Sequence, residues 1–314
     1  MIVTQTPVRL SLLGGNTDFP EYYKEHGGSV LSTTIDKYIY CIVKERFDDM
    51  IYINYSIKEK VSKVEDVKHD LVREALKLVG IEKGIEITFL SDIPSEGSGL
   101  GSSSAVVIGL LNALYNFTGV QVTSAELASK ACRIEIDILK KPIGVQDQII
   151  IAYGGLRHIR LDKSVEVLRL DVPKEFEDSL MLFHTNISRK AEKVLKGMKL
   201  DKKILDKNKD LANQAVNALK VGNIEEVGKL LDKYWTLKKK LNSKVTNKEI
   251  DTMYKKAKKA GAIGGKIVGA GAGGFMLLVV PQEKREAVIK TLKGYEPLDF
   301  KFDKLGSRVI FNNG

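Results

Sequence analysis

The sequence has only two cysteines, Cys41 and Cys132, among its 314 residues. Two cysteines are too few for a disulfide framework, and we interpret them as reduced core residues of the kind found in cytoplasmic proteins. No apolar run approaches the length needed to cross a bilayer, and the first residues show no basic segment followed by an apolar one, so no secretory signal is predicted. The sequence therefore predicts a cytoplasmic protein without a membrane partner.

The chain also lacks the pattern of a nucleic-acid-binding protein, although its formal net charge is +10. Much of the excess comes from lysines between Lys190 and Lys259, where Asp and Glu are interleaved with them. Such a distribution is typical of solvated helix faces, and no basic residues alternate with aromatic ones for base stacking. We therefore expect no nucleic-acid partner, while the positive charge is compatible with anionic small substrates.

The length of the chain suggests two domains, each able to bury its own core. Hydrophobic residues make up 43% of the sequence and charged residues 29%, which is ordinary for a globular protein. The character changes after Val172 and Pro173, so we place the boundary near Asp171, between residues 1–171 and 172–314. Strands and helices alternate irregularly in both parts, and the predicted fold class is α+β rather than doubly wound α/β.

Local patterns predict the individual elements. Aromatic and β-branched runs predict strands at 8–13, 35–43, 85–90, 180–184 and from 275 on, a hairpin at 156–161 and 165–170, and terminal strands near 299 and 309. Apolar periodicity predicts helices at 67–79, 106–117, 123–140 and 283–292, and several lysine-rich helices between 188 and 260. The segment 106–117 is too apolar for a surface position.

The most informative stretch runs from Pro94 to Ala105. Between Gly97 and Ser104 every residue is Gly or Ser except Leu100. Glycines let the backbone approach a ligand and adopt positive φ, and serines at a helix start lie beside free N–H groups at the positive end of the helix dipole. These are the properties of a phosphate-binding loop, and a simple turn with a serine N-cap would need fewer of these residues.

Other glycine motifs fit this chain less well. A P-loop fails around Gly265 and Lys266, because its first glycine and its final Ser or Thr are missing. The dinucleotide fingerprint at 269–274 is followed by an apolar strand rather than a helix, so a Rossmann site is not expected. A nucleophile elbow fails because Ala105 stands where glycine is required. A serine hydrolase that uses Ser103 stays open as a minor alternative.

A second motif runs from Pro7 to Phe19. A predicted strand carries Arg9, and a Gly-Gly turn then presents Asn16, Thr17 and Asp18. Short polar side chains after such a turn can bind hydroxyl groups, and an aspartate can accept two hydrogen bonds. The alternative is an Asx turn that caps the next segment.

Two acidic residues and a second glycine loop complete the set. Glu135 lies on a predicted helix, and Asp147 lies in the segment 144–148, which we place on or near a loop. One carboxylate can hold Mg²⁺ while the other acts on a hydroxyl proton, the division of labour that phosphoryl transfer requires. Taken alone, two such acids would be ordinary surface charges. The backbone amides of Lys266 to Gly274 could close over a triphosphate.

These four segments, in this order, resemble the GHMP kinases, the family of galactokinase, homoserine kinase, mevalonate kinase and phosphomevalonate kinase. The first family motif resembles Pro7–Phe19, the second Pro94–Ala105 and the third Lys266–Gly274. The resemblance extends from the first predicted strand to the last glycine loop. It implies a two-domain GHMP kinase fold, with an N-terminal α+β domain that carries the phosphate loop and a ferredoxin-like C-terminal α+β domain.

Within that family the chain is similar to sugar anomeric kinases of the D-glycero-D-manno-heptose 7-phosphate kinase group. The matching residues are Gly14–Pro20 with Tyr22 and Tyr23, His26–Tyr38, Gly144–Gln148, and Thr185 with Ser188 and Arg189. Galactokinase has Gly at the position of Val8 and Glu-His in place of Gly15 and Asn16, which argues against galactose. The heptose kinase group usually has Gly where this chain has Asn16.

The resemblance implies a role for each matched residue. Asp147 corresponds to the catalytic base, with Arg9 as the basic residue beside it, and Ser103 and Glu135 correspond to the Mg²⁺ ligands. The residues implied in ATP binding are Pro94, Gly97, Ser98, Gly99, Leu100, Gly101, Ser102, Ser103, Ser104, Gly271 and Gly273. The residues implied in substrate binding are Asn16, Thr17, Asp18, Gly28, Gln146 and Arg189, with Asp18 at the position that binds sugar hydroxyls in galactokinase.

We therefore expect a monomeric or homodimeric kinase that uses ATP and Mg²⁺ to phosphorylate the anomeric hydroxyl of D-glycero-D-manno-heptose 7-phosphate. Alternatives are another GHMP small-molecule kinase, such as a fucose-type sugar 1-kinase, and a non-catalytic ligand sensor with this fold. The joint presence of Arg9, Ser103, Glu135 and Asp147 argues against the sensor. Arg189 is expected to bind the substrate's own phosphate, because it lies near a predicted helix start that follows a strand.

Overall fold

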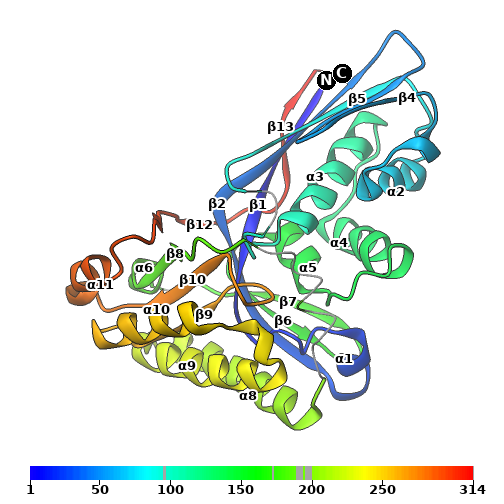
Figure 1. Ribbon diagram of the computed structural model, residues 1–314. Coiled ribbons are helices and arrows are strands. Elements are labelled where there is room, and N and C mark those ends of the chain that lie inside the picture. Colours follow the sequence, from blue (N-terminus) through cyan, green and yellow to red (C-terminus); the bar gives the residue numbers. More distant parts are fainter. Residues whose placement is uncertain (95–96, 172, 189–193, 195–199, 314) are drawn as a thin grey trace.

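The computed structural model describes residues 1–94, 97–171, 173–188, 194 and 200–313. The described chain forms two lobes, each built around its own β-sheet (Figure 1). The two termini lie side by side at the far end of the larger lobe (Figure 1), where the backbone N–H of Asn313 donates to the carbonyl of Met1 at 3.0 Å. None of the described helices is long and apolar enough to cross a membrane.

The larger sheet has nine strands within the described part of the chain. They are β1 (Ile2–Leu13), β2 (Gly28–Glu45), β3 (Ile51–Asn54), β4 (Lys58–Val61), β5 (Ile85–Ser91), β6 (Arg157–Leu161), β7 (Val165–Arg169), β12 (Phe302–Asp303) and β13 (Arg308–Asn312). Their main order is β13-β1-β2-β5-β3-β4, and the β6–β7 hairpin and β12 pair with β2. The predicted hairpin is thereby confirmed.

The pairing of β1 with β2 determines where Arg9 lies. The two strands are antiparallel from Ile2 opposite Val43 to Leu13 opposite Leu31. The register shifts once between residues 7 and 8 and again between residues 11 and 13, so irregularities occur on both sides of Arg9. Bulges of this kind redirect side chains and are common beside active sites. Residues 6–13 are all buried, so Arg9 is a charged residue in a strand enclosed on both faces.

Helices cover one face of the larger sheet (Figure 1). They are α1 (Pro20–His26), α2 (Asp70–Val79), α3 (Ser102–Phe117), α4 (Ser124–Cys132), a π-helical segment (Arg133–Ile138) and α5 (Gln146–Tyr153). The predicted burial of α3 is confirmed, because it packs against β1, β2 and three neighbouring helices. The helix predicted at 123–140 starts with a capping box between Thr123 and Glu126 but becomes π-helical after Cys132.

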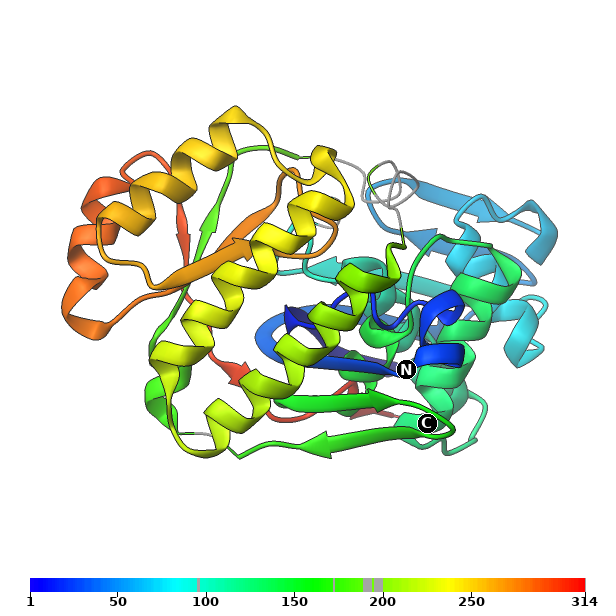
Figure 2. The ribbon, with the colours of Figure 1, turned by 90° about the horizontal axis from the view of Figure 1, so that it is seen from below.

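The smaller lobe holds a four-stranded antiparallel sheet in the order β11-β8-β10-β9. Its strands are β8 (Leu180–His184), β9 (Gly264–Ile267), β10 (Phe275–Val279) and β11 (Pro297–Leu298). Its helices are α6 (Lys174–Asp178), α8 (Lys202–Lys220), α9 (Ile224–Leu241), α10 (Lys248–Lys259) and α11 (Arg285–Thr291). Helix α8 contacts β1 and β2 as well as α9, so it connects the two lobes (Figure 2).

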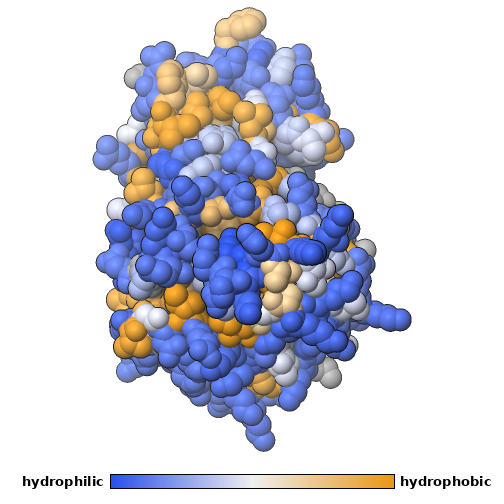
Figure 3. All heavy atoms as spheres, turned by 90° about the vertical axis from the view of Figure 1, so that its left-hand side faces the viewer, coloured by the Kyte–Doolittle hydropathy of each residue, from blue (hydrophilic) through white to orange (hydrophobic). Residues whose placement is uncertain are grey.

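Two large hydrophobic cores of described residues correspond to this arrangement, beside a small third cluster of Tyr22, Leu205 and Leu241. One extends from the larger sheet and α3 into α8, α9 and β10. The other is confined to the smaller lobe, around Phe183, Trp235 and Met276. The face of the molecule in Figure 3 is largely hydrophilic, with small separate apolar patches. Scattered apolar residues are normal on protein surfaces, so these patches need no further explanation.

Several elements differ from the sequence-based prediction. Helix α1 and strands β3 and β4 were not predicted, and the segment 144–148, predicted on or near a loop, leads directly into α5. The terminal strands β12 and β13 pair with β2 and β1, so the last residues return to the larger sheet. Local strand propensity does not identify a strand's partner, and the boundary near Asp171 stays a prediction.

Candidate active site

The two glycine loops lie in contact with each other. In the first loop Gly97, Gly99 and Gly101 have φ angles of 77°, 76° and 80°, a region that glycine adopts without strain. A Cβ added at Gly99 would lie only 2.6 Å from the carbonyl oxygen of Val268, at the start of the second loop. Glycine is therefore required both by the backbone conformation and by the close approach of the second loop.

Helix α3 begins directly after this loop. Gly101, in the left-handed conformation, is the N-cap, and no side chain caps the helix. The three serines form the first turn, with Ser98 Oγ at 3.1 Å from Ser102 Oγ. The Ser103 and Ser104 hydroxyls donate to the Glu135 side chain rather than to the backbone of this turn. The backbone N–H groups of this turn thus suit an anion, as the sequence predicts.

Glu135 accepts hydrogen bonds from the Ser103 and Ser104 hydroxyls. Ser103 Oγ donates to Oε1 at 2.7 Å, Ser104 Oγ donates to Oε2 at 2.8 Å, and Gln148 Nε2 donates to Oε2 at 2.6 Å. The Glu135 side chain is 1% exposed and is presented by the π-helical segment. The Lys141 ammonium donates to Ser103 Oγ at 3.3 Å and lies 3.8 Å from Glu135 Oε1. The structure therefore brings the two predicted metal ligands together, beside a protein cation.

The Ser103 hydroxyl and the Glu135 carboxylate could together supply part of the ligand set of a Mg²⁺ ion. Within the described residues, no group of three or more His, Cys, Asp and Glu side chains could hold a metal ion. Mg²⁺ in kinases needs only one or two protein ligands, because substrate phosphates and waters supply the rest. The carboxylate of Glu135 and the exposed Ser103 hydroxyl are suitable donors, and the Lys141 ammonium already stands beside both. These residues fit an ion that arrives together with a nucleotide.

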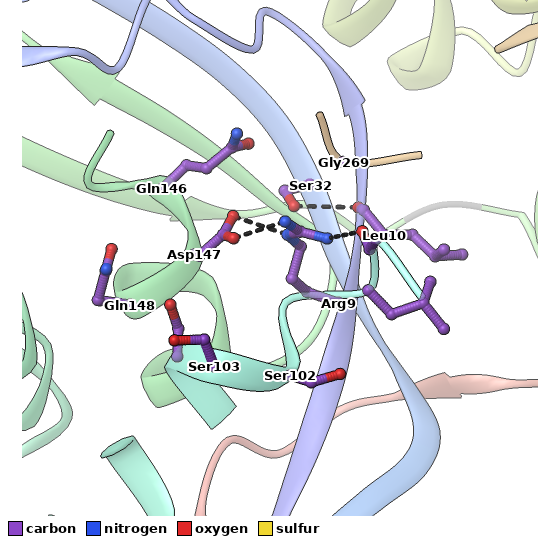
Figure 4. A network of polar contacts seen from close by, with 12 residues as sticks. Arg9, Leu10, Ser32, Ser102, Ser103, Gln146, Asp147, Gln148 and Gly269 are labelled. Carbon is purple, nitrogen blue, oxygen red and sulfur yellow. Dashed lines mark hydrogen bonds and ion pairs between the residues drawn. The ribbon is translucent and has the colours of Figure 1, made fainter. Parts of the chain in front are cut away.

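Asp147 and Arg9 form the centre of the site (Figure 4). Arg9 Nε donates to Asp147 Oδ1 at 2.7 Å, and Arg9 Nη2 donates to Oδ2 at 2.5 Å. The remaining Nη1 donates to the carbonyl of Gly99 at 2.5 Å. A planar guanidinium that binds both carboxylate oxygens fixes the position and the plane of the carboxylate. The predicted catalytic pair is therefore in direct contact, and Arg9 also joins it to the phosphate loop.

Asp18 is enclosed beside this pair. The backbone N–H of Gln146 donates to Oδ2 at 3.1 Å, while Oδ1 has no hydrogen-bond partner among the described residues. A Cβ added at Gly144 would lie 2.0 Å from Asp18 Oδ2, so only glycine fits there. Burial raises the pKa of Asp18 to about 6, and repulsion by Asp147 contributes to the increase.

The turn before Asp18 holds the other predicted substrate residues. Asn16 has φ 72°, a left-handed conformation that Gly and Asn both tolerate. The Thr17 hydroxyl lies 2.7 Å from the Gly14 carbonyl and 3.0 Å from the Ser29 carbonyl, and it accepts the Ser29 N–H at 3.1 Å. A Cβ at Gly28 would lie 2.3 Å from the Thr17 carbonyl. Thr17 and Gly28 therefore build this turn, and their contact with a substrate stays a prediction.

Gln146 and Asn208 have further buried polar atoms that form no hydrogen bond with the described residues. Gln146 Oε1 and both side-chain polar atoms of Asn208 are buried without a hydrogen-bond partner among the described residues. Asn208 shares a face of α8 with Leu205, which packs against Tyr22, and with Ala212, which lies beside Gly14. Asn208 therefore faces the loop that carries Asp18. It was not predicted, although an Asn at an apolar position of an amphipathic helix was a usable signal.

The remaining predicted ATP-binding residues lie along the two loops. Leu100 is buried, and its carbonyl accepts the Arg9 N–H at 2.9 Å, whereas Pro94 is exposed. Gly271 and Gly273 both have positive φ, and a Cβ on either would meet the neighbouring backbone or side chains within 2.6 Å. Arg189 lies outside the described residues. Thr185 is described, and its hydroxyl donates to the Gly274 carbonyl at 2.8 Å, which holds the end of the second loop.

Comparison with known proteins decides the family. Residues 66–155 match the family described as GHMP kinases N terminal domain, and residues 215–296 match GHMP kinases C terminal. The chain is 33% identical over 335 residues to the D-glycero-alpha-D-manno-heptose 7-phosphate kinase of Campylobacter jejuni, with 97% of each covered. The chain belongs to the GHMP kinase family. It is also 27% identical to the galactokinase of Pyrococcus furiosus, with 91% of each covered.

The structural comparison agrees with this assignment. A crystal structure of a D-glycero-D-manno-heptose 1-phosphate kinase from Bacteroides thetaiotaomicron matches this GHMP kinase with a TM-score of 0.84 and 26% identity, over 100% of both chains. The predicted two-domain α+β fold is confirmed. Membership also makes the protein an enzyme, a kinase that uses ATP as its phosphate donor.

The raised pKa of Asp18 predicts a pH-dependent cost to stability. Folding raises this pKa from its ordinary value of 3.8 to about 6, so the folded state holds the proton more tightly and loses stability as pH rises from 3.8 through about 6. Relative to Asp18→Asn, the wild-type free energy of unfolding should fall by about 1 kcal/mol between about pH 5 and pH 7.5. Urea unfolding across this range measures the difference, with the exposed Asp137→Asn as control. Parallel curves for wild type and Asp18→Asn would contradict the burial argument.

Proposed function

We propose that this GHMP kinase is a sugar kinase that transfers the terminal phosphate of magnesium-bound ATP to the anomeric hydroxyl of D-glycero-D-manno-heptose 7-phosphate. The observation that supports a sugar most directly is a pair of buried acceptors, Asp18 Oδ1 and Gln146 Oε1, which accept no hydrogen bond from any described residue. Both lie beside Asp147, since Gln146 precedes it in α5 and the Asp18 and Asp147 charges repel each other. A ligand with several hydroxyl donors would satisfy both atoms.

Because these acceptors are buried, they discriminate between ligands that have hydroxyl donors and ligands that lack them. A buried acceptor without a donor costs about 1–3 kcal/mol, so a ligand that supplies donors gains affinity relative to one that cannot. Asn208, on a face of α8 that lies beside the loop carrying Asp18, adds both a donor and an acceptor. Such a set of groups suits a polyhydroxylated substrate better than a mevalonate-like acid with a single reacting hydroxyl.

Asp147 is the group that acts on the acceptor hydroxyl. Two of its roughly four lone-pair positions accept hydrogen bonds from Arg9, and the others can accept the hydroxyl proton. Arg9 fixes the plane of the carboxylate and links it to the phosphate loop through the Gly99 carbonyl. The N–H groups at the start of α3 and in the second loop bind the phosphate oxygens. Asp147 thereby positions the hydroxyl and receives its proton.

The metal would lie at the other end of this arrangement. Ser103 and Glu135 would hold Mg²⁺, which neutralises charge on the β- and γ-phosphates when bound. Lys141 would leave the two oxygens as the metal arrives, and Ser104 and Gln148 would keep the carboxylate in place. The sugar phosphate is supported by the heptose 7-phosphate kinase relative from Campylobacter jejuni.

A substrate screen tests the proposal. ADP release is measured with D-glycero-D-manno-heptose 7-phosphate, the unphosphorylated heptose, fucose and galactose, and the product phosphate is located by NMR. The expected result is turnover of the heptose 7-phosphate with new phosphate on the anomeric carbon. Turnover of an unphosphorylated sugar alone would instead indicate a plain sugar 1-kinase. ADP release from none of them would argue against a sugar kinase.

The role of Asp147 predicts the effect of Asp147→Asn. This variant keeps the size of the side chain but removes the anionic acceptor of the hydroxyl proton, so kcat should fall by a factor on the order of 10²–10⁴. ADP affinity should be unchanged, because ADP lacks the terminal phosphate, the part of the nucleotide that is proposed to meet Asp147. Steady-state kinetics and ADP titration measure the two effects, with Asp137→Asn as a matched control. A near-normal kcat would remove Asp147 from the mechanism.

The proposed metal ligands predict a change in magnesium dependence. Glu135→Gln replaces an anionic ligand with a neutral one, so the Mg²⁺ concentration for half-maximal rate should rise. Ser103→Ala should have a smaller effect in the same direction, since only a neutral donor is lost. Asp137→Asn, two residues from Glu135 and exposed, controls for the change of charge. If the titrations of Glu135→Gln and wild type coincide, the metal assignment is wrong.

The substrate's own phosphate gives a separate test. Planar arginine binds phosphate through two hydrogen bonds, and we expect Arg189 to provide that contact. Arg189→Ala should raise the KM for the sugar phosphate about 10-fold or more, without a comparable change in the KM for ATP. Initial rates against both substrates measure the two constants. An unchanged KM for the sugar phosphate would show that Arg189 does not bind it.

A further inference from the structure

Lys266 is a buried lysine on β9 to which the proposed mechanism gives no role. Its side chain is among the largest that are fully buried, and the residue is 1% exposed. It lies opposite Leu277 in the smaller sheet, immediately before the second glycine loop. Lysines are almost never fully buried unless they are paired. The surroundings of Lys266 therefore indicate what it binds.

The described part of the chain offers Lys266 neither an ion pair nor a hydrogen bond. The side-chain contact that it does offer is the ring of Tyr234, whose centroid lies 4.7 Å from Nζ. A ring face contributes about 1–2 kcal/mol to a desolvated cation. An uncompensated buried charge costs several kcal/mol. The ring alone therefore does not stabilise the charged lysine.

The neighbouring charges are mostly basic. Arg9 from β1 and Lys238 from α9 repel the Lys266 ammonium, and Asp147 from α5 attracts it, but both Asp147 oxygens already accept hydrogen bonds from Arg9. Burial lowers the pKa of Lys266 well below its usual range, and Lys238 and Arg9 lower it further. Lys266 is thus acted on by two cations and by one carboxylate that already pairs with Arg9, and a further anion would relieve the repulsion.

The position of this cluster suggests which anion it accepts. Arg9 donates to the Gly99 carbonyl at 2.5 Å, and Lys238 donates to the Gly269 carbonyl. These two glycines are where the loops touch, since a Cβ at Gly269 would lie 2.6 Å from the Gly99 carbonyl. Arg9 and Lys238 therefore each donate a hydrogen bond to a backbone carbonyl at the contact between the two loops. Lys266 precedes the second loop on β9 and donates to no carbonyl of the described loop residues.

We propose that Lys266 is a further catalytic residue, whose ammonium contacts the terminal phosphate of the bound nucleotide. This inference rests on the proposed function, because that phosphate passes between the glycine loops and Asp147. In the transfer, the acceptor oxygen bonds to the γ-phosphorus and the bond from phosphorus to the bridging oxygen breaks. The electron pair leaves with ADP, and the hydroxyl proton goes to Asp147. Lys266 keeps its proton and neutralises the non-bridging oxygens.

Nucleotide binding without sugar tests this contact. Lys266→Met keeps the length of the side chain and removes its charge, and calorimetry compares ADP with the non-hydrolysable ATP analogue AMP-PNP. Affinity for AMP-PNP should fall about 10-fold or more, as expected for a lost charge-assisted contact, while ADP affinity stays unchanged. Lys256→Met removes the same charge from the exposed face of α10 and should affect neither nucleotide. Equal losses for both nucleotides, or no loss, would overturn the proposal.

Proton uptake on nucleotide binding to the wild-type protein tests the same contact without relying on a variant that folds correctly. A phosphate that meets Lys266 raises its pKa, so AMP-PNP should bind with more proton uptake than ADP at about pH 8.5, as seen by calorimetry in buffers of different ionisation enthalpy. Equal proton uptake would contradict the contact. If the sugar is phosphorylated but neither experiment detects the Lys266 contact, the role of Lys266 is wrong and the proposed function stands. If the wild-type protein binds no nucleotide, both the role of Lys266 and the proposed function are wrong.

Discussion

The bidentate pair between Arg9 and Asp147 is the interaction on which the site depends. The Arg9 guanidinium is buried in a strand, and its donors reach Asp147 on α5 and Gly99 in the phosphate loop. Three segments far apart in the sequence are thereby held at one point. Removing one partner of a buried ion pair costs about 3–5 kcal/mol, because the other charge remains buried. The pair therefore has a structural role in addition to its chemistry.

The backbone around the pair is adapted to it. Irregular pairing of β1 with β2 occurs on both sides of Arg9, which allows a charged side chain to leave a strand that is otherwise packed on both faces. Gly101 lies against the same side chain, since a Cβ there would be 3.0 Å from Arg9 Cγ. Glycine at this position therefore serves the arginine as well as the phosphate loop.

The sequence predicted those parts of the site that short-range rules control. Glycines that need positive φ, serines at a helix start and acids in a motif can be identified locally. The structure brings Arg9 to Asp147 and Ser103 to Glu135, and the roles of these residues stay predictions. The sequence did not predict the π-helical segment that presents Glu135, because a change in hydrogen-bond spacing leaves no pattern in residue type. The return of β13 to β1 was also missed, since strand propensity does not identify partners.

Asn208 and Lys266 show a different reason why sequence prediction fails. Each is a polar residue among apolar neighbours, on α8 and β9, and neither element alone shows what the polar group contacts. Both are buried where the smaller lobe packs against the larger one. The need for a further partner appears only when the lobes are assembled, because no described residue then forms a hydrogen bond with these polar atoms.

The same absence of partners connects stability to function. Asp18 Oδ1, Gln146 Oε1, Asn208 and the Lys266 ammonium are all desolvated, and each lowers the stability of the free protein. A ligand with hydroxyl donors on one side and phosphate oxygens on the other would satisfy these groups together. Binding energy gained in this way is specific, since a ligand that lacks either kind of group leaves buried atoms unpaired. The polarity of the site is therefore complementary to the sugar and the phosphate that it is proposed to join.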